Sequence, residues 1–200
     1  MKLTKLAFHL ACALGAGTAF AQADLPQTLS AAMQVQAWAQ SDASPLNLIK
    51  WKVGDYHKMK INVAGFINGT GRKEANREEA DKNAVWLTNE ISVLGQRQKT
   101  EALIDRATGK TLKLIVNGKE QDPGQQGDIE IIEQAETTVT VGAGTFDCFY
   151  IKANVTAQGQ KQVVELWVNP IDVNLDGSLK VVAQSQMGPV TLTVEEFGPR

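Results

Sequence analysis

The chain has 200 residues, with 20 Lys or Arg against 22 Asp or Glu, so its formal net charge at pH 7 is −2. A chain of this length is expected to form one domain with a true hydrophobic core. The nearly balanced charge indicates neither a nucleic-acid partner nor an anionic membrane surface. Composition therefore favours a single globular domain and gives no support to a strongly basic binding protein.

The N-terminus has the pattern of a cleavable secretory signal peptide. Two lysines precede an apolar run that ends near Phe20, and small residues allow cleavage after Ala23 or, nearly as well, after Ala21. The run is too short to span a bilayer comfortably, and no stop-transfer pattern follows it. We therefore expect residues 1–23 to be removed and residues 24–200 to form a single mostly-β domain. This domain is expected to be periplasmic or secreted, without stable membrane insertion after cleavage.

The spacing of apolar residues changes once along the chain. Residues 26–40 carry them at three- and four-residue intervals, which predicts an amphipathic helix. From Leu48 onward the period is two, with Gly, Asn and Asp as punctuation, and Asn117-Gly118 is a strong hairpin signal. The expected strands lie at 51–66, 85–93, 98–105, 112–116, 129–132, 137–141, 146–155, 162–169, 179–184 and 190–197. The predicted fold class is mainly β, a large curved antiparallel sheet or half-barrel with an N-terminal helix.

Two segments allow more than one interpretation. Residues 72–83 are highly charged, which fits either a short solvated helix or a loop. Asp172, Asn174 and Asp176 have the spacing of the first half of a calcium-binding loop. The position that supplies a bidentate carboxylate in such loops is Ala183, so a plain Asp-Gly turn is favoured over a metal site.

The chain lacks the nucleophile elbow, the phosphate loop and the dinucleotide fingerprint. Beyond residue 23 it has one histidine, His57, and one cysteine, Cys148, which excludes a two-histidine metal site and an intrachain disulfide. His57 is expected to be a surface or strand histidine rather than a catalytic base. Cys148 is expected to be buried and inert, because Asp147 and Phe149 beside it raise a thiol pKa. We therefore predict a protein that is not an enzyme and holds no metal or cofactor.

Both faces of the segment 146–151 carry apolar residues, and Trp167 is flanked in sequence by the apolar residues Leu166 and Val168. A strand in a one-sided sheet should alternate, so the middle of the sheet is expected to be covered twice. This fits either a close-packed core or a concave apolar cavity for a ligand. At most one of the two phenylalanines can line such a cavity directly, because they are an odd number of residues apart. The residues predicted to bind the ligand are Trp86, Phe146, Phe149 and Trp167.

Short motifs in the second half of the chain resemble a known group of proteins. Residues 144–148, Gly-Thr-Phe-Asp-Cys, begin a strand, and Glu-Leu-Trp-Val-Asn-Pro at 165–170 leads through a turn to Gly-Ser-Leu-Lys at 177–180. These motifs resemble an uncharacterised secreted family near the fold of the periplasmic Lol lipoprotein carriers, the LolA/LolB-like proteins. The resemblance implies a half-open β-barrel lidded by helices, with an apolar cavity for acyl chains.

Together these patterns lead to an expected function and one alternative. We expect a secreted envelope protein that binds an apolar ligand, a lipid or a lipidated chain such as a lipoprotein, without catalysis. The alternative is a structural or assembly-supporting envelope protein with no ligand cavity. An apolar cavity would favour the first interpretation, and a filled core with an exposed apolar patch would favour the second.

Overall fold

The structure, a computed structural model, describes residues 51–123, 128–157, 160–185 and 188–199. The predicted signal peptide and the predicted helix at 26–40 lie outside these residues. No helix in the described part of the chain is long and apolar enough to cross a membrane.

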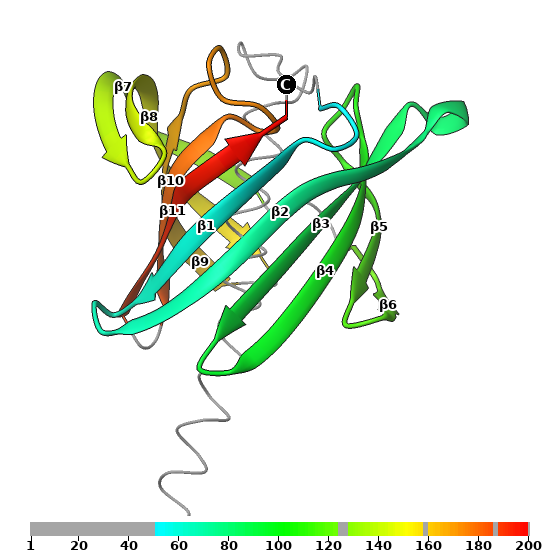
Figure 1. The fold of residues 1–200 in the computed structure, drawn as a ribbon, viewed down its shortest axis with the longest axis horizontal. Coiled ribbons are helices and arrows are strands. Elements are labelled where there is room, and N and C mark those ends of the chain that lie inside the picture. The colour runs from blue at the N-terminus through cyan, green and yellow to red at the C-terminus, as the bar shows by residue number, and fades with distance from the viewer. Residues whose placement is uncertain (1–50, 124–127, 158–159, 186–187, 200) are drawn as a thin grey trace, which may run out of the picture.

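The described residues form eleven strands and one 3-10 turn (Figure 1). The turn is η1 (Ala80–Lys82). The strands are β1 (Tyr56–Val63), β2 (Ile67–Glu79), β3 (Ala84–Val93), β4 (Gln96–Asp105), β5 (Thr111–Val116), β6 (Lys119–Gln121), β7 (Asp128–Val141), β8 (Gly144–Ala157), β9 (Gln160–Val168), β10 (Ser178–Ser185) and β11 (Gly188–Gly198).

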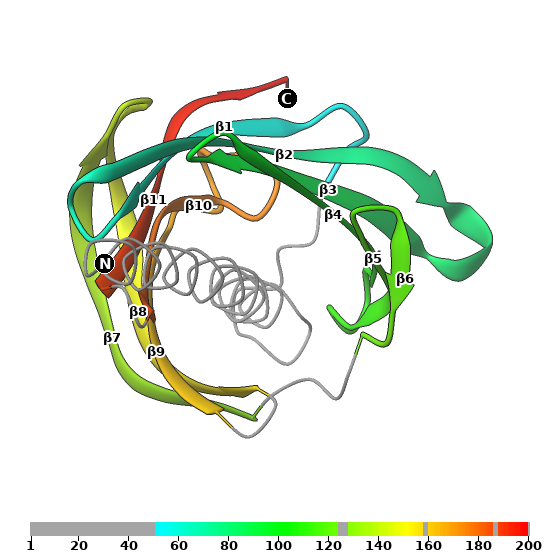
Figure 2. The ribbon, with the colours of Figure 1, turned by 90° about the horizontal axis from the view of Figure 1, so that it is seen from below.

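All of these strands belong to one antiparallel sheet, in the order β6-β5-β4-β3-β2-β1-β11-β10-β9-β8-β7. Strands that follow one another in sequence pair with each other, except that β1 pairs with β11 and that β6 and β7 form the two edges. Figure 2 shows that the sheet curls round, which gives it a concave inner face and a convex outer face. The predicted fold class, a mainly β protein with a large curved antiparallel sheet, is confirmed.

The charged segment 72–83 is neither a helix nor a simple loop. β2 continues to Glu79, and the 3-10 turn follows it. Most charged side chains of this strand lie on its solvated side, so a high charge is compatible with a strand in a sheet that buries one face. The two strands expected at 129–132 and 137–141 are likewise parts of one long strand, β7.

The inner face of the sheet is apolar. On β1 it carries His57, Met59, Ile61 and Val63, which are buried, while the residues that alternate with them are more exposed. The largest cluster of buried apolar side chains, here called the main core cluster, lies on this face and includes residues of β1, β3, β8, β9, β10 and β11. Its buried members are Met59, Ile61, Val63, Ile91, Val93, Ile151, Ala153, Val155, Val164, Leu166, Val168, Val181, Ala183, Val190, Leu192 and Val194. A second cluster, here called the Trp51 cluster, consists of Trp51, Ala75, Val85, Leu87, Ala102, Ile104 and Leu175.

Two glycines on the inner face of β2 allow the sheet to bend. Gly69 and Gly71 lie opposite Ile61 and Met59 of β1. A Cβ atom at Gly69 would be 2.5 Å from the carbonyl oxygen of Ser92, and one at Gly71 would be 3.1 Å from Cε of Met59. Groups of the adjacent strands therefore occupy the space above both glycines. Side chains of β1 and β3 can thus extend over β2.

Candidate functional site

A row of polar side chains crosses the inner face next to the Trp51 cluster. His57 on β1, Lys73 on β2 and Asn89 on β3 lie directly opposite one another in the strand register. All three are buried. Buried polar groups cost free energy unless they are hydrogen-bonded or paired with an opposite charge. This buried polar row is therefore a candidate functional site.

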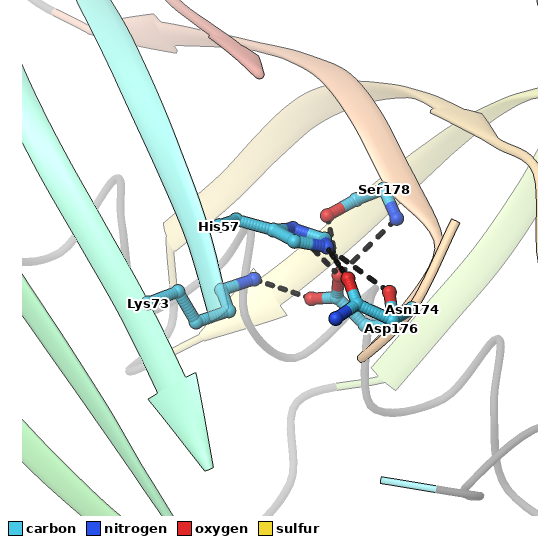
Figure 3. A network of polar contacts seen from close by, with 5 residues as sticks. All are labelled: His57, Lys73, Asn174, Asp176 and Ser178. Carbon is cyan, nitrogen blue, oxygen red and sulfur yellow. Dashed lines mark hydrogen bonds and ion pairs between the residues drawn. The ribbon is translucent and has the colours of Figure 1, made fainter. Parts of the chain in front are cut away.

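The connection between β9 and β10, residues 169–177, contacts this row (Figure 3). Asn169 organises the connection, because its Oδ1 accepts two backbone N–H groups at 2.9 and 2.8 Å and its Nδ2 donates to the carbonyl oxygen of Asp147 at 2.9 Å. Gly177 has φ +65°, and a Cβ there would lie 2.9 Å from the carbonyl oxygen of Asn169. The loop thus has a fixed local structure, which presents residues 174–176 to the sheet.

The end of this loop is attached to the sheet by an apolar and a charged side chain. Leu175 belongs to the Trp51 cluster. The Oδ2 atom of Asp176 forms an ion pair with Nζ of Lys73, and the exposed fractions of these side chains are only 3% and 2%. The Oδ1 atom of Asp176 accepts hydrogen bonds from the hydroxyl of Ser178 at 2.6 Å and from its N–H at 3.1 Å. One carboxylate therefore connects the loop to the middle of the sheet.

The neighbours of His57 determine which ring nitrogen carries the proton. Nε2 lies 3.0 Å from the carbonyl oxygen of Asn174 and 3.1 Å from its Oδ1. The amide of Asn174 is oriented by its Nδ2, which donates to the carbonyl oxygen of Pro199 at 2.9 Å. Because both groups that face Nε2 are acceptors, Nε2 is the protonated nitrogen of the neutral ring. Nδ1 lies 3.8 Å from Oδ1 of Asp176 and has no hydrogen-bond partner in the described part of the chain.

Burial and charge shift two pKa values in this cluster. Burial lowers the pKa of His57 below its ordinary value of 6.5, and the charge of Lys73 lowers it further, although Asp176 opposes both. For Asp176, burial by itself raises the pKa, but Lys73, His57 and the hydrogen bond from Ser178 together outweigh it and hold the pKa below 3.8. At neutral pH the cluster therefore contains a neutral imidazole beside an ion pair.

The cluster contains the side-chain types of a hydrolytic site without its geometry. The hydroxyl of Ser178 donates to Asp176 and not to the imidazole of His57. A serine nucleophile requires a base that is hydrogen-bonded to its hydroxyl. In this structure the arrangement connects the loop between β9 and β10 to the inner face of β1 and β2.

The side-chain oxygens of Asp172, Asn174 and Asp176, whose spacing resembles half a calcium loop, each contact a different protein group. Asp172 accepts a hydrogen bond from Nδ2 of Asn169 at 2.9 Å, the Oδ1 of Asn174 faces His57, and Asp176 pairs with Lys73. They therefore do not converge on one centre. Within the described residues, no group of three or more His, Cys, Asp or Glu side chains is placed to hold a metal ion.

The structure does not bring together the four residues predicted to bind an apolar ligand. Trp86 lies on the outer face of β3, where its Nε1 donates to Glu79 at 2.7 Å. Phe146 and Trp167 are half-buried and belong to a different cluster, on the opposite side of their strands from Phe149. Phe149 alone shares the inner face with the main core cluster, and 36% of it is exposed. Ligand binding by these residues stays a prediction.

The strand that was predicted to be apolar on both faces is covered on both. Cys148 packs with Val139, Val173 and Leu179, whereas Ile151 belongs to the main core cluster. The thiol of Cys148 is free and buried, as predicted from the sequence. Burial raises its pKa, and the charge of Asp147 adds to this effect, so the thiolate is disfavoured.

Sequence reasoning missed the pairing of Lys73 with Asp176. The two residues are 103 positions apart, and the pattern around Asp176 indicates an Asp-Gly turn or, less favoured, a calcium ligand, but no ion pair. A signal for Lys73 exists, because Gly69, Gly71, Lys73 and Ala75 occupy every second position of β2. Once this segment is assigned as a strand, Lys73 falls on the inner face.

No family model matches the chain, and no curated protein matches it either. Among solved structures, a protein described as a lipoprotein from Parabacteroides distasonis has a TM-score of 0.45 at 11% identity, over 74% of this chain and 96% of that chain. An exported protein with a YmcC-like fold from Bacteroides fragilis has a TM-score of 0.44 at 11% identity, over 76% and 99%. MucB has a TM-score of 0.37 at 15% identity, over 84% of this chain and 58% of MucB. Similarities of this size assign neither a family nor a function.

The ion pair between Lys73 and Asp176 is expected to stabilise the fold as a unit. Lys73→Met leaves a buried carboxylate without its cation, and we expect the free energy of unfolding to fall by about 3–5 kcal/mol. Lys73→Met combined with Asp176→Asn removes both charges and keeps an acceptor for Ser178. Urea denaturation of both single variants and the double variant should show that the double variant loses much less than the sum of the two. Additive losses would contradict the pairing.

The neutral state of His57 makes stability sensitive to acid. The folded protein has a lowered His57 pKa, so the unfolded chain binds more protons below about pH 6.5, and the free energy of unfolding falls as the pH falls through that region. In His57→Gln the amide can still donate to Asn174 but does not titrate. Urea denaturation above and below pH 6.5 should show a weaker pH dependence for this variant. The same dependence in both proteins would exclude His57 as its source.

Proposed function

We propose that this chain is an exported protein of the cell envelope or the extracellular space that binds an apolar ligand, a lipid or a lipidated chain, on the inner face of its sheet, without catalysis. The proposed location follows from the secretory pattern of residues 1–23. The proposed activity follows from the character of the inner face. We propose binding rather than catalysis, and the polar cluster beside that face connects the loop 169–177 to β1 and β2.

The apolar character of the inner face carries the proposal. The main core cluster extends across six strands without a charged side chain among its members. The sheet curves around this face (Figure 2), so the cluster lies on its concave side, and sites for apolar ligands are concave and mostly apolar.

Part of the inner face on β7 and β8 is accessible. Phe149 is 36% exposed, and Ile129 and Ile131 of β7 are only partly buried against the main core cluster. Over β2, β3 and β4, Leu175 of the loop 169–177 and the other members of the Trp51 cluster fill the inner face with protein side chains. We therefore place the ligand beside Phe149.

A fluorescent fatty acid tests this placement. Phe149→Lys puts a charge on the exposed part of the inner face, and it should weaken binding of the probe by about tenfold or more, because a buried ammonium group beside an acyl chain is strongly unfavourable. Phe66→Lys is the matched control, since Phe66 is 72% exposed in the turn between β1 and β2. Both replaced side chains are exposed, so both variants should fold.

Two results of this titration would contradict the proposal. One is that the wild-type protein does not bind the probe. The other is that Phe149→Lys and Phe66→Lys bind it equally well. Either result would favour the alternative expected from the sequence, a structural or assembly-supporting envelope protein.

A further inference from the structure

The outer face of the sheet contains a groove that the proposed function does not use. Its volume is about 650 Å³, and β1, β2 and β3 line most of it. Its polar lining residues include Lys58, Lys60, Arg72 and Arg97, with Glu90 and Glu195 as the acidic ones. The local excess of positive charge contrasts with the net charge of −2 of the whole chain.

In one row of side chains across this face, here called the neutralised row, every cation forms a salt bridge with a nearby carboxylate. Lys58, Arg72, Glu90 and Lys99 lie directly opposite one another on β1, β2, β3 and β4. Each cation of this row has a carboxylate partner, because Lys58 pairs with Glu196 at 2.8 Å, Arg72 with Glu74 at 2.8 Å and Lys99 with Glu101 at 3.1 Å. This row therefore has little charge to offer a ligand.

The next row toward the turns of the β1–β2 and β3–β4 hairpins is different. Lys60, Thr70, Ser92 and Arg97 lie opposite one another on the same four strands. They place two hydroxyls between two cations, with no carboxylate in the row. Lys60 and Arg97 are exposed, and within the described residues neither forms a salt bridge. A sheet spacing of about 4.8 Å puts the Cα atoms of Lys60 and Arg97 about 14 Å apart.

We infer that this row, called here the Lys60–Arg97 row, binds a ligand that carries phosphate groups. Ammonium, guanidinium and hydroxyl groups are the side-chain donors that phosphate oxygens accept best. The two hydroxyls add donors between the cations, so an extended ligand with more than one anionic group fits better than a single ion. Glu90 faces Arg72 and Lys99 in the neutralised row. Glu195 accepts a hydrogen bond at 3.4 Å from the hydroxyl of Thr193, which lies opposite Lys60 on β11, so this carboxylate is at the β11 end of the row and Arg97 is at the other.

This site is independent of the apolar ligand, because neighbouring residues of a strand point to opposite faces of the sheet. The phosphate group can belong to a soluble phosphate ester or to a lipid headgroup. Two probes separate these sources. Glucose 1,6-bisphosphate represents the soluble ester, and vesicles of phosphatidylglycerol in phosphatidylcholine represent the headgroup, with pure phosphatidylcholine vesicles as reference.

Three variants make the test specific to the row. Lys60→Gln with Arg97→Gln should weaken binding by about tenfold or more, since each charge-assisted hydrogen bond contributes about that factor. Lys110→Gln with Lys119→Gln removes the same charge from exposed positions outside the groove and should change binding little. Thr70→Val with Ser92→Ala keeps every charge and should still weaken binding. All replaced side chains lie on the surface, and thermal unfolding checks that each variant is folded.

Binding of glucose 1,6-bisphosphate with this order of effects supports a site for a soluble phosphate ester. Binding of the phosphatidylglycerol vesicles alone, with the same order, supports a site for a lipid headgroup. The inference is overturned if neither probe binds, or if the two charge variants lose the same affinity, which would mean that only overall charge matters. It is also overturned if the variant without the two hydroxyls binds like the wild type and the Lys60–Arg97 variant loses nothing.

Discussion

The buried ion pair between Lys73 and Asp176 is the interaction on which one end of the inner face depends. Each charge alone in these surroundings would cost several kcal/mol, so the strand and the loop are stable only in each other's presence. The pair places Leu175 in the Trp51 cluster and Asn174 on His57. Protein side chains thereby fill the inner face over β2, β3 and β4, while Phe149 on β8 stays partly exposed.

A single curved sheet gives the chain two chemically different faces. Alternation along β1 sends apolar residues such as Ile61 to the inner face and charged residues such as Lys60 to the outer face. Gly69 and Gly71 help to keep the inner face apolar, because they leave room there for apolar side chains of the adjacent strands. An apolar site and an anion site can therefore coexist on the same strands without sharing a side chain.

Much of the fold follows from the sequence, and the candidate site does not. Period-two patterns and the Asn117-Gly118 turn are local signals, and both have their counterparts in the structure, where Asn117 and Gly118 have the positive φ angles of such a turn. The charge of residues 72–83 concealed the end of β2, because solvated charges occur on strands as well as in loops. The partner of Lys73 could not be found from sequence, because it comes from a loop 103 residues away.

The predicted ligand residues illustrate the same limit of local patterns. These side chains were expected near the middle of the sheet, but β8, which carries Phe146 and Phe149, lies next to the edge strand β7. Trp86 lies in one cluster, Phe146 and Trp167 lie in another, and only Phe149 shares the main inner face. Which face an aromatic side chain occupies depends on strand register, and a shift of one residue reverses it.

Native mass spectrometry of the protein isolated from its own envelope tests the central claim most directly. The account predicts a folded species that carries one equivalent of a hydrophobic compound, and a clearly smaller bound fraction for Phe149→Lys isolated in the same way. A protein that is free of any hydrophobic compound, or a compound retained equally by the variant, would contradict the claim that the inner face binds an apolar ligand.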